Sequence, residues 1–390
     1  MKTFLKFLRH LKFLGFTFTL RLLSFVARLG RRSPRHTIFL TGDISYTGGT
    51  WTYFQKLFRL LEENGYTVVI ILEKRFLQQP LYEKLKPSTK QVISLGNAEP
   101  LRNFFKLLLL QWQYRPSALV QSISGFVDNS FLELLHIPIL VILHSIVGES
   151  FSKRIDAKLR RVNIRTFWLF TVSRYAAEHF QLYHSDYGIP CHYLYTGVPH
   201  ISFPKKLGSP NIVLTVGHLV SYKRPELWLQ IAKTLSSEKL HFQWVGEGEL
   251  LTTLRTHAKD FPFIQFLGYS DTIESFYAQA TIYLHTSMLE SYGLAVVEAM
   301  SAGLPVVTSA HCALPELVDN GVNGYVCTTD SNEEYIDRLQ ALLANPEQYT
   351  KFSEAAYSKW NTVFSDQRWS FQMTSIVQKV TTCESSATDL

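Results

Sequence analysis

Residues 281–308, TIYLHTSMLESYGLAVVEAMSAGLPVVT, place a buried strand, a loop, a helix and a second strand in immediate succession. The pattern predicts strands at Thr281–Leu284 and Pro305–Thr308 and a helix at Tyr292–Ser301. Short apolar strands joined through helices are typical of parallel sheets, because a parallel connection needs a crossover. This stretch therefore predicts an α/β unit with a parallel sheet.

The same alternation extends outward over most of the chain. Further strands are expected at 37–41, 67–72, 118–121, 137–144, 167–172, 212–216, 240–245 and 263–266. Residues 197–210 hold three prolines and two glycines and predict a linker. We therefore expect two Rossmann-like α/β domains whose parallel sheets face a central cleft. The expected parts are an arm at 1–35, a first domain at 36–204, a second at 205–362, and a C-terminal helix with a polar tail at 363–390.

Charge and cysteine content narrow the class of protein. The chain of 390 residues has a formal net charge of +7, and its four cysteines form no CxxC pair. Scattered cysteines argue against a disulfide framework or a zinc site and favour a reducing cytosol. The positive charge lies in a Phe/Leu-rich segment, which argues against nucleic-acid binding.

The N-terminal arm is basic and amphipathic. Its longest uncharged run, Phe13–Leu20, is much shorter than the roughly 20 residues that span a bilayer. Before the first acidic residue, Asp43, come nine cations: Lys2, Lys6, Arg9, Lys12, Arg21, Arg28, Arg31, Arg32 and Arg35. The arm predicts a helix on an anionic membrane surface, hence a cytoplasmic protein peripheral to the inner face of a membrane. A helix packed on its own domain or a partner, and a cleaved signal, remain alternatives.

Two glutamates flank the start of the helix that is expected after the loop. Glu290 lies just before it, and Glu298 is eight residues on, about two turns along one face. A helix N-terminus attracts a diphosphate, and Gly293 lets backbone approach a ligand. Two carboxylates beside an anion site suit hydroxyls at both ends of a ligand, although solvated helix glutamates are an alternative. The predicted donor site contains Glu290, Ser291, Tyr292, Gly293, Leu294 and Glu298.

With the following Ala-Gly-Leu-Pro-Val-Val, this segment resembles the donor-site signature of retaining GT-B-fold glycosyltransferases, family four. The resemblance covers about residues 37–380. Residues 216–223, VGHLVSYK, are similar to the family's loop in which an arginine and a lysine clasp the donor diphosphate; Lys223 matches the lysine, and His218 replaces the arginine. Phe242–Gly248 resembles the family's second donor-domain strand and glycine turn, which implies a donor contact at Gly246.

The first half offers a second group of candidate residues. Gly48 and Gly49 precede an expected helix, where backbone can approach donor phosphate or acceptor; a mere turn is the alternative. His144 ends an apolar strand and is expected to project toward the cleft. The resemblance implies that His144 lies near the transferred sugar and that Ser173, an expected N-cap, faces the acceptor side.

The resemblance implies a retaining transfer from a nucleotide diphosphate sugar, UDP- or GDP-linked, with no cofactor. The sequence has no Asp-x-Asp pair, HExxH motif or clustered His/Cys ligand set, which predicts that the transfer needs no metal. Lys223 and helix N–H groups would stabilise the leaving diphosphate, Glu290 would orient the sugar, Glu298 would bind the ribose, and His144 would support the sugar or acceptor. The acceptor is expected to be a glycan or lipid, such as a lipid-linked glycan. The C-terminal helix is expected to cross to the first domain. A sugar-nucleotide epimerase or hydrolase, or an inactive sugar-nucleotide-binding protein, remain alternatives.

Overall fold

The protein is divided into two compact units in a computed structural model that describes residues 36–42, 48–73, 92–95, 100–124, 137–146, 164–201 and 211–382. The first unit comprises residues 1–172, 177–193 and 372–390, and the second comprises 173–176 and 194–371. The basic arm at 1–35 lies outside the described residues, so its expected helix stays a prediction.

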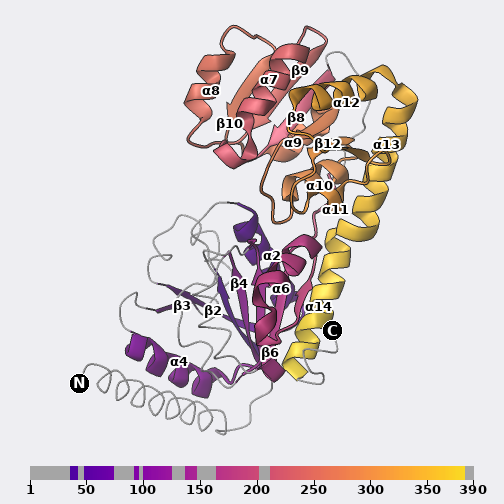
Figure 1. Cartoon of the computed structure of the whole chain (residues 1–390). Coiled ribbons are helices and arrows are strands. Elements are labelled where there is room, and N and C mark those ends of the chain that lie inside the picture. The colour runs from indigo at the N-terminus through magenta and orange to yellow at the C-terminus, as the bar shows by residue number, and fades with distance from the viewer. Residues whose placement is uncertain are drawn as a thin grey trace, which may run out of the picture. The chain divides into compact units, whose positions relative to one another are not determined.

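The first unit is built on a parallel sheet that has seven strands in the described residues, in the order β3-β2-β1-β4-β5-β6-β7 (Figure 1). The strands are β1 (Thr37–Gly42), β2 (Thr67–Glu73), β3 (Val92–Leu95), β4 (Ala118–Ile123), β5 (Ile139–Leu143), β6 (Phe167–Thr171) and β7 (Cys191–Tyr193). β5 and β6 are buried along their whole length, as expected for central parallel strands with both faces covered. The helices are α2 (Gly49–Glu63), α4 (Pro100–Tyr114) and α6 (Arg174–His184).

The second unit repeats this plan with six parallel strands in its described part, in the order β10-β9-β8-β11-β12-β13 (Figure 1). The strands are β8 (Asn211–Val216), β9 (Leu240–Val245), β10 (Ile264–Gly268), β11 (Ile282–His285), β12 (Val306–Ser309) and β13 (Gly324–Cys327). The helices are α7 (Pro225–Leu235), α8 (Leu251–Ala258), α9 (Ile273–Gln279), α10 (Leu294–Ser301), α11 (Leu314–Leu317), α12 (Asn332–Ala344) and α13 (Pro346–Lys359). The predicted fold class, two Rossmann-like α/β domains with parallel sheets, is confirmed.

The strand order of the second sheet reverses between β8 and β11. The chain runs from β8 to β9 and β10 on one side, and from β11 to β12 and β13 on the other. Ile282 and Tyr283 of β11 pair with Val213 and Leu214 of β8. In open parallel sheets, ligands bind at such a switch point, beyond the carboxyl ends of the strands.

A buried tryptophan fixes the helix α7 to the second sheet. Trp228 is fully buried and meets Phe242 and Trp244 of β9 edge-on, at ring-centroid distances of 5.8 and 5.4 Å. Aromatic pairs in this geometry add to the stabilisation from burial alone. Because α7 follows the loop after β8, this packing anchors that loop at its far end.

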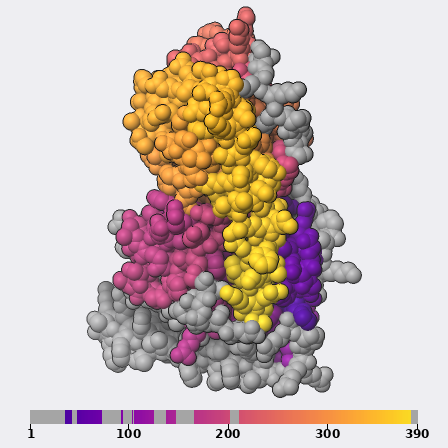
Figure 2. Space-filling model, turned by 90° about the vertical axis from the view of Figure 1, so that its right-hand side faces the viewer, coloured from indigo at the N-terminus to yellow at the C-terminus, as the bar shows by residue number. Residues whose placement is uncertain are grey.

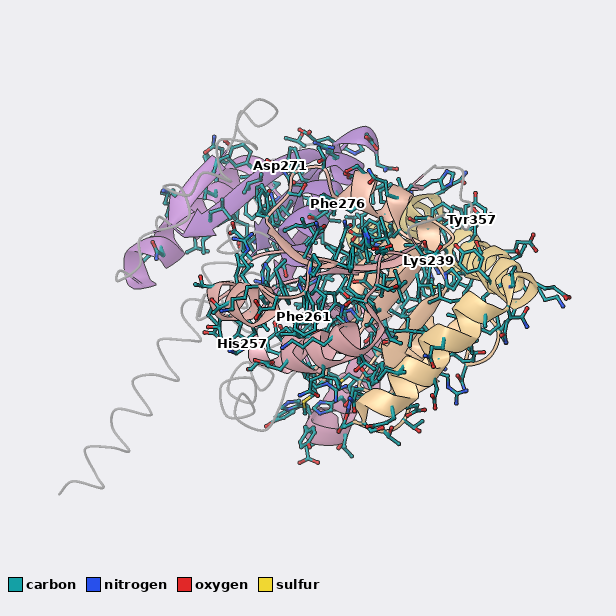
Figure 3. The ribbon with its side chains drawn as sticks, turned by 90° about the horizontal axis from the view of Figure 1, so that it is seen from above. Lys239, His257, Phe261, Asp271, Phe276 and Tyr357 are labelled. Carbon is teal, nitrogen blue, oxygen red and sulfur yellow. The ribbon has the colours of Figure 1, made fainter. Side chains whose placement is uncertain are left out.

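The segment that enters the second unit is held by the C-terminal helices. Val198 forms a parallel bridge with Ser365, and the Trp360 indole donates to the Val198 carbonyl at 3.0 Å. His200 stacks on Trp360 and meets Tyr357, labelled in Figure 3, edge-on. The start of the predicted linker is therefore packed within the second unit, and residues 202–210 lie outside the described residues.

The last helix, α14 (Asp366–Thr382), begins in the second unit and belongs to the first from Gln372 onward. There it lies beside the indigo segment that contains β1 and α2 (Figure 2), and the Tyr66 hydroxyl is 3.5 Å from that of Thr381. Within the described residues, no helix is both long and apolar enough to cross a bilayer.

Three strands were not predicted from the sequence: β3, β7 and β13. Each is the outermost strand of its sheet and has only three or four residues, so its apolar run is too short to show a period. β13 also begins at Gly324, a residue that normally argues against a strand. Glycine is required there because an added Cβ would lie 2.1 Å from the Val306 carbonyl oxygen.

Gly246 provides a test of the backbone packing that supports the loop after β8. Its φ is +144°, and a Cβ there would lie 2.0 Å from the Gly217 carbonyl oxygen. We expect Gly246→Ala to lower the free energy of unfolding by roughly 1–3 kcal/mol, because backbone must move apart. Chemical denaturation measures this, with Gly48→Ala as control, since a methyl group at Gly48 meets no atom within 4 Å. Equal stability of the two variants would contradict the packing.

Candidate functional site

Two loops of the second unit flank the switch point of the sheet. Residues 217–224 follow β8 and include a short 3₁₀ turn, Ser221–Lys223, and residues 286–293 follow β11 and lead into α10. The Met288 amide donates to the Tyr222 carbonyl at 2.8 Å, so backbone ties the two loops together. Side chains on these loops are therefore held near one another beyond the strand ends.

The two loops meet at the carboxylate of Glu290. Its Oε1 forms an ion pair with the Lys223 ammonium and lies 2.8 Å from Nε2 of His285, the last residue of β11. The side chains of Lys223, Glu290 and His285 are 16%, 13% and 3% exposed. The structure thus joins the predicted Lys223 and Glu290 directly, and adds a buried histidine to them.

The protonation states in this cluster follow from burial and charge. Burial alone would raise the pKa of Glu290, but the Lys223 ammonium and the His285 hydrogen bond outweigh it and lower that pKa to about 2. Burial lowers the pKa of His285, with Glu290 opposing. At neutral pH Glu290 is therefore an anion and His285 is neutral. Because the carboxylate can only accept, we assign the His285 proton to Nε2.

The helix after Glu290 begins two residues later than the sequence predicts. α10 starts at Leu294, and Gly293 precedes it with φ 100° and ψ 51°, a left-handed conformation outside the helix. The prediction that Tyr292 and Gly293 lie in the first turn is therefore wrong. The Val296 and Val297 amides both donate to the Gly293 carbonyl. Leu294 and Ala295 supply the first N–H groups, which have no acceptor within a helix.

Glu298, on α10, is held by a tyrosine from a neighbouring helix. The Tyr277 hydroxyl donates to Glu298 Oε2 at 2.7 Å and to the Ala295 carbonyl at 3.2 Å. Phe276, labelled in Figure 3, marks the position of α9, which carries Tyr277. Burial raises the pKa of Glu298 to about 7; the Tyr277 hydrogen bond opposes this rise and the charge of Glu274 adds to it.

Two residues that the resemblance placed at the donor site differ in their surroundings. His218 is exposed in the loop after β8. Gly246 is engaged by backbone: its amide donates to the Gly268 carbonyl at 2.8 Å, and it touches Gly217. The described contacts of Gly246 explain why glycine is required there, and its contact with a donor stays a prediction.

Other predicted residues serve the packing around the site. The Ser173 hydroxyl accepts from the Ala176 amide at 3.1 Å and thereby caps α6, as expected, and it donates to the Ser291 carbonyl. Tyr292 is buried, and its hydroxyl donates to the Thr196 carbonyl at 2.8 Å. The Tyr292 side chain is thus part of the core, which leaves its backbone as the part that can reach a ligand.

The remaining predicted residues lie in the first unit. Gly48 is the N-cap of α2, and Gly49 is its first residue. His144 follows β5, with its Nε2 2.9 Å from the Ser122 hydroxyl and its ring edge-on to Tyr53. Burial lowers the pKa of His144 to about 3, so the imidazole is neutral at pH 7. Nothing in these contacts tests the predicted roles of the three residues.

His285 and Tyr277 contact the two glutamates but were not predicted from the sequence. His285 could have been found, because it ends a buried strand five residues before Glu290, the same kind of position that singled out His144. No sequence pattern pointed to Tyr277, since an aromatic residue on an amphipathic helix is normally predicted to be part of the hydrophobic core. In the described part of the chain, no group of three or more His, Cys, Asp or Glu side chains could hold a metal ion.

Part of the chain is similar in sequence to known glycosyltransferases. Residues 200–359 match the family model of glycosyl transferases group 1. An uncharacterized glycosyltransferase of Haemophilus influenzae is 32% identical over 36% of this chain and 42% of its own length. Spore coat protein SA of Bacillus subtilis is 30% identical over 44% of this chain and 50% of its own length. The chain thus spans about half the length of these curated relatives.

The similarity in fold extends over most of the chain. The crystal structure of Anabaena Alr3699/HepE in complex with UDP and glucose has a TM-score of 0.75 and 15% identity, and the match covers 88% of this chain and 100% of that one. The protein therefore has the GT-B fold, and residues 200–359 of its second unit are similar to the group 1 glycosyl transferases.

The raised pKa of Glu298 predicts a pH-dependent stability. The folded protein binds this proton more tightly than the unfolded chain, whose glutamates titrate near 4.5. The free energy of unfolding should therefore fall as pH rises from about 5 to about 8. The Glu298→Gln variant should lack this pH-dependent contribution to stability. Its melting temperature should therefore increase relative to that of the parent protein as pH rises.

Thermal unfolding at pH 5, 6, 7 and 8 measures the difference. Glu347→Gln is the control, because the pKa of Glu347 is lowered by Lys351 and the carboxylate stays ionised over this range. A difference between Glu298→Gln and the parent that does not change with pH would contradict the assignment.

Proposed function

We propose that this protein is a retaining, metal-independent glycosyltransferase that uses a nucleotide diphosphate sugar, and that the donor binds at the loops after β8 and β11. The observation that carries the proposal is the Lys223–Glu290 ion pair at the start of α10. It joins a cation and a carboxylate in the loops beyond the switch point of the sheet, with Glu290 four residues before α10 begins at Leu294, and a helix N-terminus attracts phosphate.

The diphosphate is bound by Lys223 and the first turn of α10. An ammonium has three N–H donors, and the pair with Glu290 uses one of them. The remaining donors can face phosphate oxygens, together with the N–H groups of Leu294 and Ala295. A diphosphate in this position gains stabilisation as its negative charge develops during transfer.

The two carboxylates bind the hydroxyl groups on either side of the diphosphate. Among the described residues, Glu290 Oε2 has no hydrogen-bond partner, so it can accept from the donor sugar. Tyr277 holds Oε2 of Glu298, and no described residue hydrogen-bonds to its Oε1, so Oε1 can accept from the ribose. A structural neighbour crystallised with UDP and glucose supports a UDP-linked donor, with a GDP-linked donor as the alternative.

In the transfer, a bond forms between an acceptor hydroxyl oxygen and the anomeric carbon while the bond from that carbon to the phosphate oxygen breaks. The acceptor proton passes to the departing phosphate on the same face of the sugar, so the anomeric configuration is retained. Proton NMR of the product shows that configuration directly. The neutral His144 is assigned to the sugar or acceptor, and Ser173, Gly48 and Gly49 to the acceptor side.

Substitution of each carboxylate tests the donor assignment. Glu298→Ala should weaken UDP binding about tenfold, the cost of one charge-assisted hydrogen bond. Glu290→Ala should lower turnover by about 100-fold or more, because the sugar loses its orientation. It should leave UDP affinity within a few-fold of the parent, since Lys223 remains free to bind phosphate. Calorimetry with UDP and assays with a panel of nucleotide sugars measure both.

Glu333→Ala, an exposed glutamate in the first turn of α12, is the matched control. Parent-like UDP binding and turnover in both the Glu290 and Glu298 variants, with the fold intact, would overturn the proposal. Free sugar or an epimerised nucleotide sugar in place of a glycosylated product would favour a hydrolase or an epimerase.

We assign the acceptor to a glycan or lipid at a membrane, and the basic arm to the anionic surface of that membrane. Nine cations before the first acidic residue support this, because each cation near such a surface adds about 1 kcal/mol of attraction. Deletion of residues 1–32 should therefore abolish sedimentation with anionic vesicles while leaving UDP affinity unchanged. Unchanged sedimentation of the shortened protein would contradict a peripheral location on the membrane.

A further inference from the structure

Arg224, the residue after Lys223, has an unusual backbone conformation. Its φ is 52° and its ψ is 53°, in the left-handed region that residues with a Cβ rarely adopt. It ends the 3₁₀ turn that carries Lys223 and immediately precedes Pro225, the first residue of α7. Glycine would relieve the strain at this position, so contacts of the arginine side chain must offset it.

The guanidinium makes three different contacts. Nε donates to the Thr286 carbonyl, one terminal nitrogen to the Asp330 carboxylate, and the other to the Tyr335 hydroxyl at 3.1 Å. The Arg224 side chain is only 11% exposed, whereas that of Asp330 is 65% exposed. The planar fork therefore joins the loop after β11, the segment after β13 and the helix α12.

A hydroxyl group in the loop after β11 also contacts the backbone of the 3₁₀ turn that carries Lys223. The Thr286 hydroxyl donates to the Lys223 carbonyl at 2.9 Å and lies 3.3 Å from the Arg224 carbonyl. Four residues later in this loop is Glu290, the partner of Lys223. The backbones that carry the two ends of the ion pair are thus fastened to each other through Arg224 and Thr286.

We propose that Arg224 is a positioning residue that acts through Lys223: its fork sets the 3₁₀ turn so that the ammonium stands between Glu290 and the diphosphate. This inference rests on the proposed function of the site. Arg224 need not touch the donor, because all three of its described acceptors are protein groups. The planar, forked geometry is required, and positive charge alone does not suffice.

Two substitutions of Arg224 separate the effects of backbone strain, positive charge and the forked guanidinium. Arg224→Gly relieves the left-handed strain but removes the fork, and Arg224→Lys keeps the charge without the fork. Both should weaken UDP binding about tenfold by calorimetry, as Lys223→Ala should. The double variant Lys223→Ala/Arg224→Gly should bind no worse than Lys223→Ala within about twofold, because the arginine acts only through the lysine.

Arg255→Lys is the matched control, since Arg255 also donates its Nε to a backbone carbonyl, that of Phe266 at 2.9 Å, in the edge strand β10 at the opposite side of the sheet from β13. It should keep the UDP affinity of the parent. Melting temperatures of all variants show whether they are folded.

Parent-like UDP affinity in folded Arg224→Gly or Arg224→Lys would overturn the inference while leaving the proposed donor site standing. If the double variant lost UDP affinity by the product of the two single losses, the inference would also be overturned, because Arg224 would then act independently of Lys223. Parent-like affinity in Lys223→Ala would overturn both this inference and the proposed diphosphate contact.

Discussion

One carboxylate oxygen holds the second unit's loops in register: Glu290 Oε1, shared by an ammonium and an imidazole. A largely buried carboxylate is stable only when it is paired, and removal of one partner leaves the other charge uncompensated. The lysine comes from the loop after β8 and the histidine from the end of β11, so the pairing links side chains from two neighbouring strands of the sheet. The side chains of this cluster are therefore held in place by contacts within the folded protein.

This pairing also limits what the site can bind. An anion beside Glu290 alone would be repelled, because the carboxylate stays ionised at all but strongly acidic pH. Lys223 offsets that charge and leaves N–H donors over, whereas the neutral His285 orients the carboxylate without adding positive charge. A ligand that carries both hydroxyl groups and phosphate meets these constraints, and a simple anion or a neutral sugar meets only half of them.

The sequence allows the layout of this site to be predicted but not its details. Alternating strands and helices were enough to place Lys223 and Glu290 in loops that follow strands, because the hydrophobic period and the turn residues are local signals, whereas the family resemblance singled out Lys223. The left-handed conformation of Gly293 and the edge strand β13 were not predicted, since each depends on contacts with other segments. Glu316 shows the limit: it accepts from the Arg174 amide at the start of α6, 142 residues away, a cap that no local pattern reveals.

The two glutamates of the site differ in environment in a way that fits a division of labour. Glu290 is held ionised beside a cation, whereas burial raises the pKa of Glu298 to about 7. When the environments of two carboxyl groups in one site give them different pKa values, the two groups usually have different roles. With its pKa raised, Glu298 brings less negative charge at neutral pH to the helix proposed to receive the diphosphate, and it can still form hydrogen bonds with hydroxyl groups. The protein thereby has one anion that Lys223 neutralises and a second acceptor that does not oppose the binding of the proposed anionic donor.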